Sequence, residues 1–204
     1  MADTPLDGRV AFITGTSRGI GKALALRLAD AGAKVVSTGK SVEPHEKLPG
    51  TIVETTEEIR ERGGESIYTE LDVRDESSVQ RAIDETVDEW GQLDIVINNA
   101  GAIHLAPFEE TPPNRFDLLM DVNARGAYTT THAALPHLRE SDHAHVLTMS
   151  PPLGMEAAPG KAAYALSKLG MTFLANSLAE ELAGDDVGVN SLWLVAAIET
   201  EATR

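Results

Sequence analysis

The chain has 204 residues, of which 42% are hydrophobic and 4% aromatic, so one domain can bury a core made mainly of Ala, Val, Leu and Ile. It contains no cysteine, which excludes disulfides and Cys-ligated zinc or iron–sulfur clusters. No apolar run reaches the roughly 18 residues of a transmembrane helix, and a net charge of −15 disfavours a nucleic-acid partner.

The acidic composition has two interpretations. The chain is either an ordinary soluble acidic protein or one adapted to a high-salt cytoplasm, where dense carboxylates keep proteins hydrated. Lysine is scarcer than arginine, which agrees with adaptation to salt. Residues 1–5 lack the basic and apolar regions of a signal peptide, so we expect a cytoplasmic protein with no membrane partner.

Short apolar runs alternate with amphipathic segments along the chain. The expected strands cover 9–14, 34–38, 66–71, 93–97, 144–149 and 188–195. The expected helices cover 19–31, 51–62, 76–90, a long segment from Pro112-Pro113 to about 138, and 161–183, with a loop at 41–50. Continuous Val/Ile/Leu strands separated by helices indicate a parallel sheet covered on both faces. The prediction is an α/β fold, a doubly wound and mostly parallel Rossmann sheet of six visible strands, forming a single domain over 1–204.

A glycine-rich turn follows the first expected strand. Its sequence is Thr14-Gly15-Thr16-Ser17-Arg18-Gly19-Ile20-Gly21, and the helix after it would offer free N–H groups to a pyrophosphate. A P-loop is rejected because Thr16 and Ala23 stand where it needs a glycine and a Ser or Thr. The turn predicts dinucleotide binding by Gly15, Ser17, Arg18, Gly19, Ile20 and Gly21.

The end of the second expected strand bears on cofactor choice. NAD sites usually place a carboxylate there for the ribose 2′-hydroxyl, whereas this chain has Lys40, with Arg18 in the glycine turn. Two cations suit a 2′-phosphate, so we expect NADP(H). The alternative is that both cations simply face solvent, and Glu43 and Glu46 in the following loop keep NAD(H) possible.

Tyr164 and Lys168 are four residues apart on an expected helix, so both lie on one face. A free tyrosine has a pKa near 10, and a neighbouring ammonium would lower it toward the range useful for acid–base catalysis. This spacing alone is common, but here it follows a strand that ends near Ser150, which strengthens the prediction.

These residues resemble the short-chain dehydrogenase/reductase family over essentially the whole chain. The glycine turn, Leu71-Asp72-Val73 and Asn98-Asn99-Ala100-Gly101 match its cofactor segments. Asn123, Ser150, Tyr164 and Lys168 match its catalytic tetrad. The chain is most similar to the hydroxysteroid-dehydrogenase-like branch, on the evidence of residues 40–52, residues 121–126 and Ser150-Pro151-Pro152-Leu153.

The resemblance implies a role for each residue. Tyr164 exchanges a proton with the substrate oxygen, while Lys168 lowers the Tyr164 pKa and binds the nicotinamide ribose. Ser150 stabilises the same oxygen, and Asn123 holds a water that links Lys168 to solvent. Further cofactor contacts are expected from Asp72, Val73, Asn99, Ala100, Gly101, Ile198 and Thr200.

Two departures from the family pattern are visible. The stretch from Trp193 to Thr200 lacks the usual Pro-Gly pair, and the chain ends at Arg204, before the family's substrate-covering segment and seventh strand. We therefore expect a chain truncated at its C-terminus. The alternative to an oxidoreductase is a weak or silent dinucleotide-binding member of the same fold.

The resemblance also implies partners. The substrate would be a small hydrophobic carbonyl or alcohol, and the helices around 115–138 and 161–183 would form a homodimer or homotetramer. His143 and His145 have no third ligand at metal spacing, so no metal is expected. Trp90 and Trp193 are interpreted as core residues.

Overall fold

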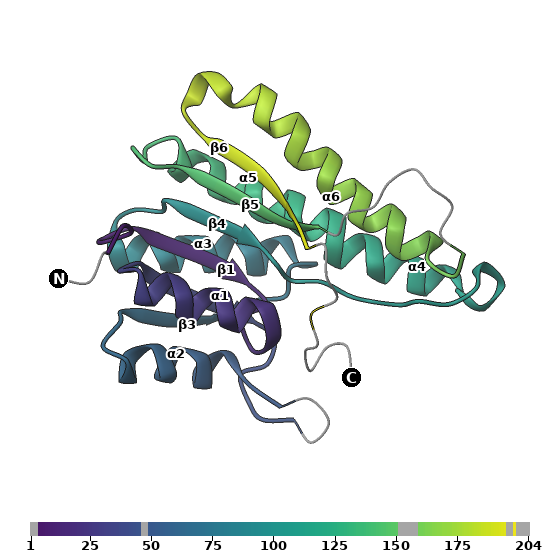
Figure 1. The fold of residues 1–204 in the computed structure, drawn as a ribbon, viewed down its shortest axis with the longest axis horizontal. Helices are drawn as coiled ribbons and strands as arrows, with labels where there is room; N and C mark the ends of the chain where they lie inside the picture. The colour runs from purple at the N-terminus through teal and green to yellow at the C-terminus, as the bar shows by residue number, and fades with distance from the viewer. Residues whose placement is uncertain (1–3, 46–48, 151–158, 195–197, 199–204) are drawn as a thin grey trace.

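Six parallel strands form one sheet in the order β3-β2-β1-β4-β5-β6 (Figure 1). The computed structural model describes residues 4–45, 49–150, 159–194 and 198. The strands are β1 (Val10–Thr14), β2 (Lys34–Gly39), β3 (Ser66–Glu70), β4 (Ile95–Asn98), β5 (His145–Ser150) and β6 (Gly188–Trp193). This confirms the predicted doubly wound α/β sheet with six strands.

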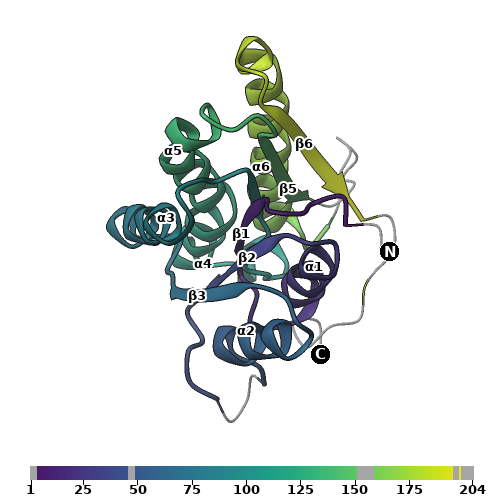
Figure 2. The same ribbon diagram turned by 90° about the vertical axis from the view of Figure 1, so that its left-hand side faces the viewer.

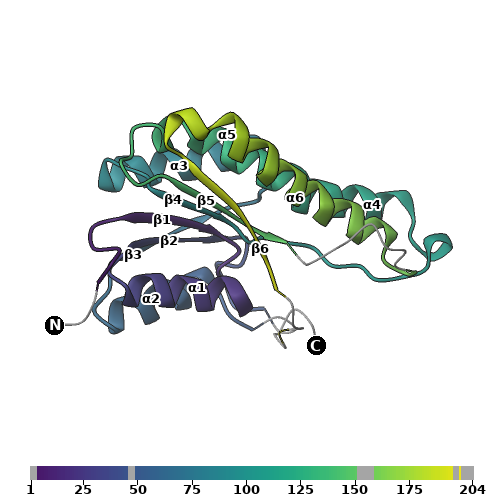
Figure 3. The same cartoon turned by 45° about the horizontal axis from the view of Figure 1, so that its top comes forward.

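The helices cover both faces of this sheet. One face carries α1 (Gly19–Asp30) and α2 (Ile52–Glu61), and the other carries α3 (Glu76–Trp90), α5 (Gly126–Leu138) and α6 (Ala162–Glu181) (Figures 2 and 3). Shorter helical segments are η1 (Phe108–Glu110), α4 (Pro113–Leu119), η2 (Met120–Arg125) and η3 (Ala183–Asp185). Apart from the long segment that begins at Pro112-Pro113, the predicted helices are therefore present, with ends that shift by one or two residues.

Strand β1 shows how the sheet builds two cores. Successive side chains of a strand point to opposite faces. Val10 and Phe12 pack into the cluster under α3, α5 and α6, whereas Ala11 and Ile13 pack into the cluster under α1 and α2. All four side chains are fully buried, which explains the continuous apolar run in the sequence.

The predicted long helix from Pro112-Pro113 to about 138 is not one regular α-helix. It consists of α4, the π-helical turn η2 and α5 in succession. The π-helical turn contains Asn123, which is fully buried. Its amide bonds to the backbone of Ala102 and to Ser167, two partners that only the folded chain brings near.

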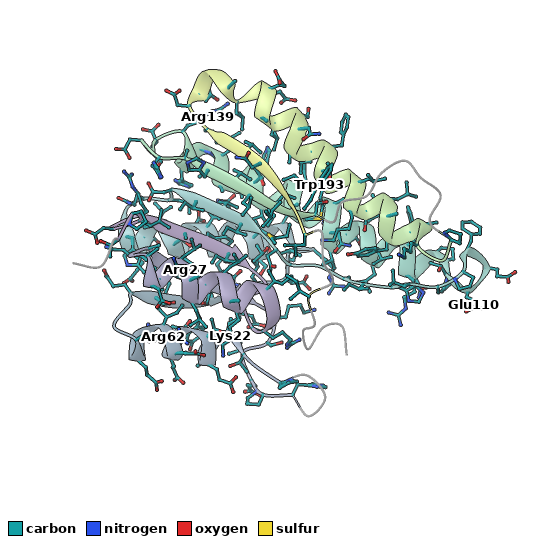
Figure 4. All side chains as sticks on the ribbon, viewed as in Figure 1. Lys22, Arg27, Arg62, Glu110, Arg139 and Trp193 are labelled. Atoms are coloured by element: carbon teal, nitrogen blue, oxygen red, sulfur yellow. The ribbon has the colours of Figure 1, made fainter. Side chains whose placement is uncertain are left out.

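The prediction of Trp193 as a core residue is wrong. Its side chain is 48% exposed, because it ends β6, which pairs with β5 on one side and is the edge strand among the described residues (Figure 4). Within the same residues, no helix is both long and apolar enough to span a membrane.

The order of the strands determines where the ligand cavity lies. The chain passes from β1 outward to β2 and β3, then returns to the other side of β1 with β4, β5 and β6. Ligands of such sheets bind at the carboxyl ends of the strands, where the order reverses. Gly15 follows β1 and Asn99 follows β4, so both lie at this reversal.

Candidate active site

A cavity of about 670 Å³ lies at the carboxyl ends of the strands. The predicted site residues that line it are Gly15, Ser17, Arg18, Gly19, Ile20, Gly21, Lys40, Asp72, Val73, Asn99, Ala100, Gly101, Ser150, Tyr164, Lys168 and Ile198. Asn123 lies behind the cavity wall, fully buried. Thr200 and Glu46 lie outside the described residues.

The glycine turn is shaped by contacts within the protein. Gly15 and Gly19 have positive φ angles of 77° and 57°, which glycine adopts without steric cost. A Cβ on Gly21 would lie 2.1 Å from the Gly15 carbonyl oxygen. Asn99 Nδ2 donates to the carbonyl oxygens of Thr14 and Gly15, at 2.9 and 3.0 Å. The Asn99 side chain, expected to touch the cofactor, therefore holds the turn in shape.

The N-terminus of α1 faces the cavity without a side-chain cap. Arg18 stands at the cap position and makes no capping hydrogen bond. The first N–H groups of an α-helix have no acceptor within the helix, and Arg18, Gly19 and Ile20 all line the cavity. An anion there would meet free donors and the positive end of the helix dipole. This turn fits the pyrophosphate of a dinucleotide.

Lys40 follows β2 and forms an ion pair with Asp72, with 3.1 Å between Nζ and Oδ2. Arg74 also binds Asp72, at 2.6 Å between Nη2 and Oδ2. The hydrogen bond from Arg74, with a smaller contribution from Lys40, holds the pKa of Asp72 well below its usual range. Asp72 therefore stays ionised, and Lys40 has a protein partner instead of only facing solvent.

Arg18 is attached to the loop that follows β2. Its Nε donates to the Pro49 carbonyl oxygen at 3.0 Å, and its Nη2 donates to Ser41 Oγ at 3.1 Å. The guanidinium therefore joins the glycine turn to both ends of the loop at 41–50. Together with Lys40 and Arg74, it makes this corner of the cavity rich in cations.

Lys168 and Tyr164 both line the cavity from α6. Lys168 Nζ donates to the Met149 carbonyl oxygen at 3.0 Å and lies 3.4 Å from Met171 Sδ. Burial lowers the pKa of Lys168 to about 8. Burial also raises the pKa of Tyr164. The expected lowering of the Tyr164 pKa by Lys168 is wrong for the protein alone, because desolvation dominates at this phenol.

Ser150 ends β5, and its hydroxyl faces α6. Ser150 Oγ lies 2.8 Å from the Lys168 carbonyl oxygen and 2.8 Å from Thr172 Oγ1. The side chain is 4% exposed and borders the cavity. The resemblance implied a hydroxyl directed at substrate, whereas in the protein alone this hydroxyl is bonded to the helix.

Asn123 makes three hydrogen bonds that join separate elements. Its Oδ1 accepts from Ala102 N at 2.7 Å, while its Nδ2 donates to Ala102 O at 3.0 Å and to Ser167 Oγ at 2.8 Å. Ser167 Oγ in turn donates to the Tyr164 carbonyl oxygen at 2.8 Å. Both N–H groups of the amide that was expected to hold a water are thus bonded to protein groups, and the amide links the segment after β4 to α6.

Sequence reasoning missed three residues that touch the tetrad: Ser167, Met171 and Thr172. A periodicity signal was available, because Thr172 lies four residues beyond Lys168 and eight beyond Tyr164, on the same helical face. Among the described residues, no group of three or more His, Asp or Glu side chains is placed to hold a metal ion.

Comparison with known proteins agrees with this geometry. Hydroxysteroid dehydrogenase-like protein 2 from Bos taurus is 45% identical over 199 residues, covering 97% of this chain and 47% of the relative. Its counterpart from Homo sapiens is 44% identical over the same length. The chain thus spans about half the length of these curated relatives.

Two solved structures extend the comparison. A short chain dehydrogenase from Mycobacterium thermoresistibile has a TM-score of 0.92 at 42% identity, covering 97% of this chain and 71% of that one. A short chain dehydrogenase from Mycobacterium paratuberculosis bound to NAD has a TM-score of 0.89 at 29% identity, covering 97% and 75%. The family model described as short chain dehydrogenase matches residues 9–204. With its parallel sheet and its cavity at the strand ends, the chain belongs to the short-chain dehydrogenase family.

Proposed function

We propose that this chain is an NADP(H)-dependent oxidoreductase that transfers hydride between nicotinamide and a small hydrophobic carbonyl or alcohol, with Tyr164 as the general acid/base. The observation that carries the proposal is one cavity that runs from the uncapped N-terminus of α1 to Tyr164 and Lys168. This cavity can hold the phosphates at one end and a reacting carbonyl at the other. Family membership supports a nicotinamide cofactor, which a neighbouring structure contains as NAD.

Tyr164 supplies the proton in this proposal. The bound cofactor supplies or accepts the hydride. Among the described residues, Tyr164 Oη has no hydrogen-bond partner, so its proton is free for a substrate oxygen. Its raised pKa keeps the phenol protonated at neutral pH, which is the state that reduction of a carbonyl requires.

Lys168 and Asn123 complete the proposed site. Lys168 presents its amine to the cavity beside Gly101, where a Cβ would lie 3.5 Å from Nζ. Gly101 therefore leaves open space in front of the amine, which suits an approach of ribose hydroxyls. Asn123 fixes the Ala102 backbone directly after Gly101, so it positions this wall of the cavity.

The preference for NADP(H) rests on charge. Arg18, Lys40 and Arg74 surround the corner at the end of β2, and Asp72 is the carboxylate that faces them. The cations outnumber the carboxylate, so a 2′-phosphate would be attracted there. NAD(H) is the alternative, because Asp72 already neutralises part of this charge.

A catalytically silent dinucleotide-binding protein is the second candidate. It is favoured by the orientation of the Ser150 hydroxyl, which is bonded to α6. It is also favoured, for the oxidation of an alcohol, by the raised pKa of Tyr164, because that direction needs the phenolate as general base. Both observations describe the protein without a ligand, so cofactor binding is common to the two candidates and turnover separates them.

The test is turnover with a panel of ketones and aldehydes. Purified protein is mixed with NADPH or NADH, and cofactor oxidation is followed by absorbance. We expect turnover of at least one hydrophobic carbonyl, faster with NADPH. Saturable NADPH binding without turnover of any carbonyl would reject the enzyme and support the silent candidate.

We also propose a homodimer or homotetramer formed through α4–α5 and α6. Tyr128 on α5 is 56% exposed, and Leu166 and Phe173 on α6 are 56% and 76% exposed. A surface that another subunit covers is expected to carry exposed apolar side chains, and these three lie on two helices of the proposed interface. A cytoplasmic location, adaptation to salt and a single domain stay predictions from the sequence.

A further inference from the structure

The hydroxyls of Ser150 and Thr172 share one carbonyl acceptor. Ser150 Oγ and Thr172 Oγ1 lie 2.8 Å apart, and either can be the donor. The Lys168 carbonyl oxygen is 2.8 Å from Ser150 Oγ and 3.4 Å from Thr172 Oγ1. Both hydroxyls are therefore within hydrogen-bond distance of the same oxygen and of each other.

The number of protons limits which hydrogen bonds these two hydroxyls can donate. Each hydroxyl has one proton, and the Lys168 carbonyl can only accept. If Ser150 donates to the carbonyl, its proton is used and none is left for a substrate. If Thr172 donates to the carbonyl, the Ser150 proton is freed to turn into the cavity that Ser150 borders. A Thr172 proton on the carbonyl therefore satisfies that acceptor without Ser150, which favours the orientation in which Ser150 donates to a substrate.

The Thr172 side chain is not part of the cavity lining. It is half-buried on α6 and does not border the cavity, whereas Ser150 does. An effect of Thr172 on a bound carbonyl would therefore pass through one of its two partners, the Ser150 hydroxyl or the Lys168 backbone, and both residues line the cavity. Because Thr172 is an ordinary helical residue with no other hydrogen-bond partner among the described side chains, its hydroxyl is available for this exchange.

We propose that Thr172 is a positioning residue that takes over the Lys168 carbonyl and thereby directs the Ser150 proton to the oxygen of the substrate. The inference rests on the proposed oxidoreductase function, since it assigns Ser150 as donor to a carbonyl substrate. It adds Thr172, on α6, to the residues that determine how Ser150 would bind the oxygen of a carbonyl substrate.

The first test removes the hydroxyl but keeps the side-chain shape. Thr172→Val is expected to lower kcat by roughly three- to tenfold, the effect of one neutral hydrogen bond, with an unchanged NADPH dissociation constant. Thr172→Ser restores the hydroxyl and should restore most of kcat. The matched control is Thr130→Val on α5, which removes a buried hydroxyl that has no partner in the described part of the chain. Thermal unfolding checks that all three variants fold.

The second test asks whether the effect passes through Ser150. Thr172→Val is combined with Ser150→Ala, and the four proteins form a double-mutant cycle. We expect Thr172→Val to change nothing further once the Ser150 hydroxyl is absent. A loss that multiplies with that of Ser150→Ala would overturn the proposal, as would an unchanged kcat in Thr172→Val alone.

A binding measurement keeps this test separate from turnover. Acetophenone is titrated into the complex with oxidised NADP, in which no hydride is available for reduction. Thr172→Val should weaken acetophenone binding roughly three- to tenfold. This loss should occur only in proteins that keep the Ser150 hydroxyl. Equal binding in Thr172→Val and wild type rejects the role of Thr172. A wild-type protein that neither turns over carbonyls nor binds acetophenone rejects the proposed function and this inference with it.

Discussion

Lys168 Nζ donates a hydrogen bond to the Met149 carbonyl oxygen at 3.0 Å, which ties the middle of α6 to the end of β5. The side chain is 7% exposed, and no carboxylate among the described residues forms an ion pair with it. Burial alone lowers its pKa from 10.5 to about 8. The folded protein therefore loses this proton at a lower pH than the unfolded chain does.

This difference predicts a pH-dependent stability. Between the folded and unfolded pKa values the unfolded chain binds more protons, so the free energy of unfolding rises with pH. Relative to Lys168→Met, the wild type should gain about 2 kcal/mol between about pH 7.5 and about pH 9.5. Urea unfolding at a series of pH values measures it. Lys161→Met, an exposed lysine before α6, is the control, and parallel curves for wild type and Lys168→Met would contradict the prediction.

Tyr164→Phe should abolish turnover. The substitution keeps the ring and removes only the hydroxyl that is proposed to exchange the proton, so kcat should fall at least about a hundredfold. NADPH affinity, measured by fluorescence titration, should change little. Tyr68→Phe on β3, outside the cavity, is the matched control. Comparable kcat in Tyr164→Phe and wild type would remove Tyr164 from the mechanism.

Lys40→Asp should shift cofactor preference toward NADH. The substitution removes a cation from the corner beside Asp72 and adds a carboxylate, so a 2′-phosphate is repelled. The ratio of kcat/KM for NADPH over NADH should drop about tenfold or more, on the order of 1.4 kcal/mol. Lys34→Asp, at the opposite end of β2, is the control. An unchanged ratio in Lys40→Asp excludes Lys40 from 2′-phosphate recognition.

Ser167→Ala should destabilise the fold. Ser167 is fully buried, accepts from Asn123 Nδ2 and donates to the Tyr164 carbonyl oxygen. Its loss leaves the Asn123 amide without one acceptor, at a cost of about 1–3 kcal/mol in the free energy of unfolding. Ser177→Ala, a hydroxyl on the same helix with an exposed hydrogen bond, should cost little. Equal unfolding midpoints in urea for the two variants would show that the buried bond contributes nothing.

Phe173→Asp should dissociate the proposed oligomer. Its side chain is 76% exposed on α6, so the change costs the isolated subunit little, whereas a subunit interface would bury the new charge. Sedimentation velocity is expected to show a smaller species than wild type. Phe108→Asp is the control, at a phenylalanine that is 86% exposed in η1, which is not one of the helices of the proposed interface. Identical sedimentation of all three proteins would place the interface elsewhere.

The fold was predictable because its signals are local. Each strand has its own apolar run, such as the fully buried residues of β1, and two of the helices have a clear start signal. Thr51 and Glu54 form a capping box at α2, and Asp75 caps α3. The glycine-rich turn was also predictable, since its three glycines lie together in the sequence directly after the first strand, and Gly15 and Gly19 adopt positive φ angles there. Handedness of the crossovers then leaves few ways to order the strands.

The sequence by itself thus determined the sheet, the place of the cavity and the identity of most residues that line it. Tertiary structure alone decided where polar atoms point. The Asn99 side chain donates to the backbone of the glycine turn, Lys40 forms an ion pair with Asp72, and the Ser150 hydroxyl hydrogen-bonds with Thr172. The physical reason is that burial forces each polar group to find a partner, and those partners come from elements far apart in the chain. Burial likewise set the pKa of Tyr164, because desolvation is a property of the packed site and not of a four-residue spacing.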